Sequence, residues 1–104
     1  SDDIYNTLVF DGLGYHNIVS FRPELRERTV FVDSLSKTYG MPGWRVGLMA
    51  GPEAIAQAIT TLNSNHITNL PEVVVAAAVA ALSGPQDVPQ QKCREFEAKR
   101  DVVL

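Results

Sequence analysis

An unbroken run of ten apolar residues, Val73 to Leu82, restricts the fold of this chain more than any other feature. Upstream, Asn69 and Glu72 have the spacing of a capping box, in which a side-chain oxygen and a carboxylate satisfy amides of the first helical turn. The pattern predicts a helix from Leu70 to about Leu82, ended by Ser83-Gly84-Pro85. A helix that is apolar on every side has to be buried in a large core or in an interface.

The interior that such a helix needs is scarce in a chain of 104 residues, which buries only about two-thirds of its unfolded surface. The sequence also begins without an initiator Met, and the apolar residues Val102-Val103-Leu104 continue a helical pattern without a stop signal. We therefore expect the chain to be a fragment of a larger protein.

The composition weighs against several classes of protein. With 45% hydrophobic and 20% charged residues the chain resembles an average globular domain, and its formal net charge of −3 disfavours a nucleic-acid partner. One cysteine cannot form a disulfide within the chain and fits a reducing compartment, for which we expect the cytoplasm. Ten apolar residues in a row are fewer than the ~18 of a membrane span, so we expect no membrane partner.

The first half of the chain is typical of strands and turns. Thr29 to Val32 is β-branched and aromatic and predicts a buried strand, and Arg45 to Ala50 predicts a second strand. The other expectations for this half are a weaker strand or extended segment over Ile4 to Phe10, a loop over Ser34 to Trp44, and a loop over Asp11 to Arg28 with a helical turn after Pro23.

The second half predicts helices on both sides of the apolar run. Gly51-Pro52-Glu53 is a helix start signal, with a proline and an acid in the first turn. Asp87 and Gln90 mark the start of a third helix, which continues to the end of the chain.

Three further features have plain structural explanations. Gly12-Leu13-Gly14 begins like a dinucleotide-binding fingerprint, but Asn17 stands where the third glycine belongs, so a turn is the better interpretation. His16 and His66 lack partners at metal-ligand spacing, and we expect no metal site. Cys93 has no histidine nearby in the sequence, which predicts an inert thiol.

Ser34-Leu35-Ser36-Lys37 allows two interpretations. As S-x-x-K it matches the first motif of serine acyl-transfer enzymes such as penicillin-binding proteins, with Ser34 as the nucleophile. The companion S-D-N and K-T-G motifs are absent, and Gly40, Pro42 and Gly43 follow too soon for the helix that this motif opens. This interpretation is the weaker one.

The second interpretation makes Lys37 the reactive group, because an amine that attacks a carbonyl forms an imine. Lys37 follows the predicted strand in a loop that also holds Ser34, Ser36 and, further on, Arg45. Two hydroxyls and a guanidinium are hydrogen-bond donors suited to a phosphate dianion. An aldehyde for the lysine and a phosphate for the other three side chains describe pyridoxal 5′-phosphate (PLP). On spacing alone, an exposed loop lysine remains the alternative.

The segment from Ser34 to Gly47, SLSKTYGMPGWRVG, closely resembles the PLP-attachment segment of class I and II aminotransferases, the aspartate aminotransferase-like family of PLP fold type I. The family pattern is S-x-S-K followed by G-W-R-x-G, and Arg45 follows Lys37 at the family's spacing of eight residues. Asp2-Asp3-Ile4-Tyr5 is similar to the family's D-E-x-Y segment, with Asp3 in place of the commoner Glu.

The resemblance implies a role for each matching residue. Lys37 would hold PLP as a Schiff base and move protons as general base and acid. Asp2 would pair with the pyridine nitrogen and Tyr5 would bond the ring oxygen of the cofactor. The residues that would anchor the phosphate are Ser34, Ser36 and Arg45.

The resemblance also implies an α/β fold, part of the three-layer αβα large domain, with a mixed sheet, packed helices and the strand near 46–50 antiparallel to its neighbours. Residues 1–104 would belong to the PLP-binding large domain, and roughly 86–104 would start the helix that leads to the small domain. We expect a homodimer, with the loop from Ser64 to Asn69 near the partner's active site.

Amino-group transfer between an amino acid and a 2-oxo acid is the activity implied for the parent protein. Four parts found in family members lie outside this chain: a phosphate-binding helix start, a ring-stacking aromatic, an asparagine near the ring oxygen and a substrate-binding arginine. We therefore expect the 104 residues alone to be inactive and to bind PLP weakly or not at all. The alternatives are a PLP-dependent lyase or synthase of the same fold, a PLP-sensing domain of a transcriptional regulator, and a remnant without activity.

Overall fold

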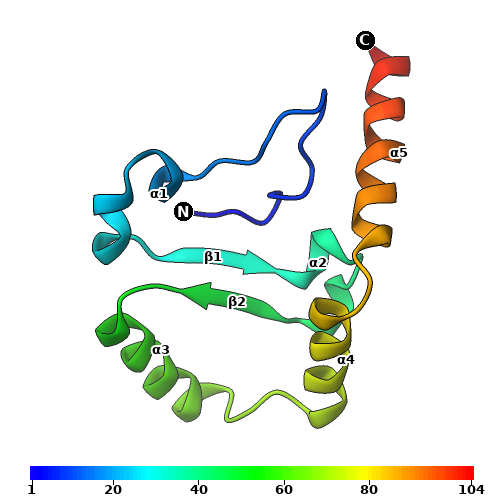
Figure 1. Cartoon of the computed structure of the whole chain (residues 1–104). Coiled ribbons are helices and arrows are strands. Elements are labelled where there is room, and N and C mark those ends of the chain that lie inside the picture. The colour runs from blue at the N-terminus through cyan, green and yellow to red at the C-terminus, as the bar shows by residue number, and fades with distance from the viewer.

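The computed structural model describes every residue from Ser1 to Leu104. At its centre two short strands, β1 (Phe31–Ser34) and β2 (Gly47–Ala50), pair antiparallel, with Ser34 opposite Gly47 (Figure 1). The helical elements around them are α1 (Ile18–Phe21), the 3₁₀ helix η1 (Pro23–Arg28), α2 (Leu35–Thr38), the 3₁₀ helix η2 (Pro42–Trp44), α3 (Glu53–His66), α4 (Glu72–Ser83) and α5 (Asp87–Val103).

The first residues of the chain lie along β1, on the edge opposite to β2 (Figure 1). Asp2 and Val32 form a parallel bridge, in which the amide of Asp3 donates to the carbonyl of Val32 and the amide of Val32 donates to the carbonyl of Ser1, both at 2.9 Å. β1 therefore has an antiparallel neighbour on one edge and a parallel contact on the other. The predicted α/β class and the antiparallel sense of the second strand are confirmed.

Two strand predictions in the first half are wrong in part. The weak strand over Ile4 to Phe10 does not form, because the chain turns at residues 4–7 and the amide of Asn6 donates back to the carbonyl of Asp3 at 2.9 Å. The first strand starts at Phe31 rather than Thr29, and it is not buried. Val32 lines an open groove of about 610 Å³ beside β2 and the α3–α4 connection, so its outer face stays exposed.

The predicted loop over Ser34 to Trp44 contains two short helices. The Ser34 hydroxyl oxygen accepts a hydrogen bond from the amide of Ser36 at 3.2 Å and so caps α2. Gly40 has a φ of 64°, in the left-handed region that glycine adopts without strain, and the helix ends before it. A single helical turn thus fits before the glycine, although the composition of the segment indicated a loop.

The helix predictions for the second half are confirmed except at one start. α3 begins at Glu53 and α5 at Asp87, as expected. α4 begins at Glu72 rather than Leu70, and the Asn69 capping box does not form. Pro71 occupies the cap position with φ −56° and ψ 141°, and this extended conformation places the first helical residue after it. No helix combines the length and the apolar character that crossing a lipid bilayer requires.

The core lies where α2, β2 and α4 meet. Leu35 is 1% exposed, and it packs with Val46 and Ala78. Tyr39, Met41, Leu48 and Val74 surround these three residues and are partly buried. α4 therefore contributes one side to the core, through Val74 and Ala78.

The rest of the molecule is open. Only six of the 104 residues are buried, and the radius of gyration is 16.0 Å, against about 13 Å for a compact domain of this length. On α4, Val73 and Val79 are 64% and 57% exposed, so these 104 residues do not supply the large core or interface expected for this helix. Within the chain, the apolar run is a surface with one buried stripe.

α5 is held against the first part of the chain by side chains at successive helical turns, Cys93, Glu97 and Arg100. The Cys93 thiol donates to the carbonyl of Val9 at 3.3 Å, and Glu97 accepts from the amide of Asp11. The two terminal nitrogens of Arg100 donate to the two carboxylate oxygens of Asp11, each at 2.8 Å. These contacts fix the direction in which α5 leaves the sheet.

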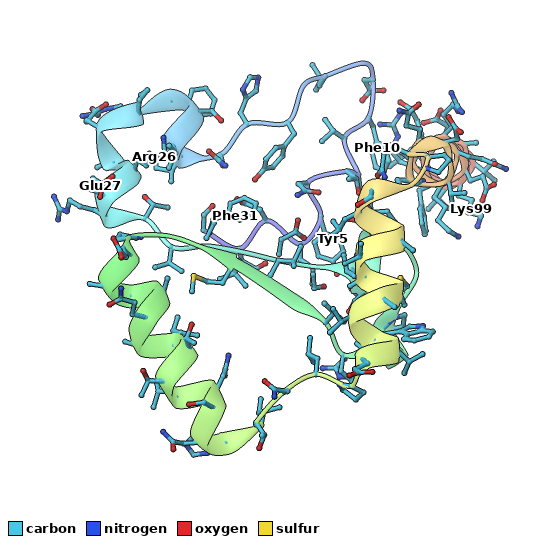
Figure 2. All side chains as sticks on the ribbon, turned by 60° about the horizontal axis from the view of Figure 1, so that its bottom comes forward. Tyr5, Phe10, Arg26, Glu27, Phe31 and Lys99 are labelled. Atoms are coloured by element: carbon cyan, nitrogen blue, oxygen red, sulfur yellow. The ribbon has the colours of Figure 1, made fainter.

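The ion pair between Asp11 and Arg100 changes the pKa of the Asp11 carboxyl. Arg100 also lies over the ring of Phe10, with 5.1 Å from its guanidinium carbon to the ring centre, and Figure 2 shows Phe10 next to α5. The hydrogen bonds from Arg100 lower the pKa of the Asp11 carboxyl below its usual value.

Acid should release α5 from this contact. The lowered pKa means that the pair stabilises the fold fully above the ordinary carboxyl pKa and loses this effect as pH falls through the lowered value. Asp11→Asn should therefore be less stable than the wild-type chain at neutral pH and equally stable near pH 2, as measured by urea unfolding followed by circular dichroism. A difference between the two proteins that did not change with pH would contradict this assignment.

Candidate active site

Four of the predicted site residues line one cavity of about 360 Å³: Ser34, Ser36, Lys37 and Arg45. The strand pairing brings them together, because Ser34 ends β1 opposite Gly47 at the start of β2. The amide of Leu35 donates to the carbonyl of Val46 at 3.3 Å and extends this link into α2. The other cavity walls, which the sequence did not single out, are Ile4, Pro42, Val46 and Gly47.

The two serines keep hydroxyl hydrogens available to the cavity. The Ser34 oxygen already accepts from the amide of Ser36, so its own O–H remains free to donate. Ser36 lies on the single turn of α2, two residues further on, and lines the same cavity. Both side chains can therefore donate to one anion.

Near the site, Arg45 is the one residue other than glycine whose backbone has a left-handed conformation. Its φ is 56° and its ψ is 42°, which costs a residue with a side chain roughly 1–2 kcal/mol. One guanidinium nitrogen donates to the carbonyl of Pro42 at 3.0 Å, which closes η2 and leaves other N–H groups to donate into the cavity. Such strain persists at functional sites when the surrounding structure imposes it.

Lys37 lies beside Tyr5, which comes from the other edge of β1. The Lys37 nitrogen is 5.8 Å from the centre of the Tyr5 ring, within the range of a cation–π contact. Figure 2 shows Tyr5 on the first segment of the chain, near the end of β1. The structure thus brings five of the six predicted residues together.

Asp2 is the sixth predicted residue, and neither Asp2 nor Tyr5 lines the cavity itself. Its carboxylate is exposed and accepts from the amide of Ile4 at 3.3 Å. Asp3 is buried instead and accepts from the Ser1 hydroxyl at 2.8 Å. Partial burial and the Asp3 carboxylate raise the pKa of Tyr15 to about 12. The two neighbouring carboxylates therefore lie in different surroundings, and Asp2 is the one left accessible.

Contacts around Tyr5 add residues that the sequence did not point out. The side-chain amide of Asn6 donates to the Asp33 carboxylate at 2.8 Å, and the hydroxyl oxygens of Thr7 and Thr38 are 3.3 Å apart. Each residue is adjacent or next but one to a predicted site residue, but nothing in their spacing indicates which of them meet.

The donor set fits a small molecule that carries both a phosphate and an aldehyde. Ser34, Ser36 and Arg45 supply hydroxyl and guanidinium donors on the wall that holds the Lys37 amine. An amine is the side-chain group that bonds covalently to a carbonyl carbon. The residues present therefore fit PLP, whose phosphate Ser34, Ser36 and Arg45 would hold and whose aldehyde Lys37 would hold.

Comparison with known proteins identifies the family. The family model for aminotransferase class I and II matches residues 1–103. The chain belongs to this family, and the resemblance inferred from residues 34–47 is confirmed.

Similar proteins match along the whole chain. A probable aspartate/prephenate aminotransferase of Rickettsia bellii is 39% identical over 104 residues, and the aspartate aminotransferase of Geobacillus stearothermophilus is 38% identical over 103 residues. The crystal structure of the aspartate aminotransferase from Rhizobium meliloti superimposes with a TM-score of 0.90 at 35% identity, covering 97% of this chain. The chain spans about a quarter of the length of these relatives, 26% in the first two and 25% in the third.

Replacing Arg45 should separate its backbone strain from its use as a donor. Arg45→Gly relieves the left-handed conformation and should be about 1 kcal/mol more stable than Arg45→Ala in urea unfolding. Both variants remove the guanidinium, so both should lose PLP binding to the same extent. Equal stabilities would contradict the strain, and PLP binding retained by either variant would contradict the donor role.

Proposed function

We propose that this chain carries the PLP-binding lysine of an aminotransferase, which transfers an amino group between an amino acid and a 2-oxo acid. The cavity that places the Lys37 amine beside the hydroxyls of Ser34 and Ser36 and the guanidinium of Arg45 carries the proposal. When bound, PLP supplies an electron-accepting ring that weakens the bonds at the substrate α-carbon.

The cavity residues bind and orient the cofactor in this proposal. Ser34, Ser36 and Arg45 donate hydrogen bonds to the phosphate oxygens and thereby fix the position of the ring relative to Lys37. Lys37 would hold the cofactor through its nitrogen and, when released by the substrate amine, would move a proton at the substrate α-carbon.

The first segment of the chain supplies the two groups that tune the cofactor. Tyr5, beside Lys37, donates its hydroxyl hydrogen to the oxygen on the ring. Asp2 keeps a proton on the pyridine nitrogen, a role for which its accessible carboxylate is suited. Asp2 lies outside the cavity lining, so this second role rests on the family resemblance.

The relatives favour aspartate as an amino donor, since all three names quoted above contain it. We also propose that the chain forms part of a large domain, with residues 86–104 starting the helix toward a small domain. The exposed apolar side chains of α4 support this, because they would be covered by the neighbouring elements of such a domain. The homodimer stays a prediction.

A chimera tests the activity directly. These 104 residues would replace the matching quarter of the Geobacillus stearothermophilus aspartate aminotransferase, and the chimera should transfer the amino group of aspartate to a 2-oxo acid. Lys37→Ala should lower kcat by about 10³-fold or more, because it removes both the covalent contact and the proton carrier. Lys99→Ala, which removes an exposed lysine of α5, is the matched control and should leave kcat unchanged. A Lys37→Ala chimera as active as its parent would contradict the proposal.

A further inference from the structure

Tyr5 is poorly held by packing alone. Its side chain is 56% exposed and lies in the turn that leads away from β1. The turn is closed by backbone hydrogen bonds of 2.9 Å, from Asn6 to Asp3 and from Leu8 to Tyr5. These bonds shape the turn but do not attach it to the elements that carry Lys37.

The backbone bridge at Val32 attaches the chain to β1 before the turn, and two side-chain contacts attach the turn after Tyr5. The Asn6 amide nitrogen donates to one oxygen of Asp33 at 2.8 Å, across 27 positions of the sequence. The Thr7 and Thr38 hydroxyl oxygens lie 3.3 Å apart, across 31 positions, and either one can donate. Both contacts come from the two residues that directly follow Tyr5.

The partners in these two contacts, Asp33 and Thr38, flank the segment from Ser34 to Lys37 in the sequence. Asp33 immediately precedes Ser34, and its second carboxylate oxygen accepts from the amide of Ser34 at 2.6 Å. Thr38 immediately follows Lys37 and is buried, so its hydroxyl has a fixed position. Attachment at two points prevents the turn from rotating about either one, and none of the four side chains lines the cavity.

We propose that Asn6 and Thr7 are positioning residues, which hold the Tyr5 ring against Lys37 through their contacts with Asp33 and Thr38. The inference rests on the proposed function, in which the Tyr5 hydroxyl donates to the ring oxygen of the cofactor. The contacts act through Tyr5, because Asn6 and Thr7 themselves do not reach the cavity. Loss of these contacts leaves Tyr5 in the chain but moves its ring away from Lys37.

The test uses the absorption of PLP bound to Lys37. In a chain with Lys92→Arg and Lys99→Arg, Lys37 is the one remaining lysine, and a parallel sample with Lys37→Arg gives the background. The visible absorption band of the adduct changes with pH as its imine gains a proton. A hydroxyl that donates to the ring oxygen stabilises the negative charge on that oxygen when the imine is deprotonated, and so lowers the pH midpoint of the absorption change. Tyr5→Phe removes this hydroxyl and should raise the midpoint by about one pH unit.

Two variants that keep Tyr5 should reproduce that shift. Asn6→Ala and Thr7→Val remove one contact each without adding charge, and each should raise the midpoint by at least half as much as Tyr5→Phe does. Thr7→Ser retains the hydroxyl and should leave the midpoint unchanged. The double variant Asn6→Asp with Asp33→Asn exchanges the two side chains, so that an amide again donates to a carboxylate. This variant should also leave the midpoint unchanged.

The outcomes separate the inference from the proposed function. If Tyr5→Phe moves the midpoint but Asn6→Ala and Thr7→Val do not, the positioning role is wrong and the proposed function stands. If Thr7→Ser moves it as far as Thr7→Val, the effect is general loss of structure and the positioning role is also wrong. If no adduct forms on Lys37 either in the 104 residues alone or in the chimera with the Geobacillus stearothermophilus enzyme, both the inference and the proposed function are overturned.

Discussion

The antiparallel pairing of β1 and β2 is the constraint on which the candidate site depends. Ser34 lies opposite Gly47, so the residues that follow β1 meet the residues that precede β2. The link between Leu35 and Val46 continues the pairing, and the same two residues form most of the small core. Val46 belongs to both the core and the cavity lining, so the packing of the core also places Lys37 and Arg45, which adjoin the core on either side.

The first segment of the chain completes the site from the other edge of β1. Its parallel bridge at Val32 aligns Asp2 and Asp3 with the strand, and the following turn carries Tyr5 to Lys37 (Figure 1). The further link to α5, through Asp11 and Arg100, means that one stretch of eleven residues contacts both the reactive loop and the last helix. The exposed apolar face of α4 is consistent with relatives about four times as long as this chain.

The site was more predictable from the sequence than the packing was. Ser34, Ser36, Lys37 and Arg45 lie close together in the sequence, so their convergence follows from local turns and one strand pairing. The contacts of Asn6 and Thr7 with partners about thirty positions away depend on register, which composition does not encode. The Asn69 capping box failed because Pro71 imposes its own backbone angles on the helix start. The apolar pattern of α4 indicates which residues need cover but not what covers them, and these 104 residues cover only one side of the helix.

The most direct measurement is the labelling of the three lysines by PLP and by pyridoxal, which lacks the phosphate, each trapped with borohydride and mapped by peptide mass spectrometry. The cavity holds three phosphate donors, Ser34, Ser36 and Arg45, so PLP should label Lys37 in preference to Lys92 and Lys99, even if it binds weakly. Pyridoxal should label the three lysines to similar extents, because it cannot use Ser34, Ser36 and Arg45. PLP spread evenly over the three lysines would contradict the assignment of this cavity as a PLP site.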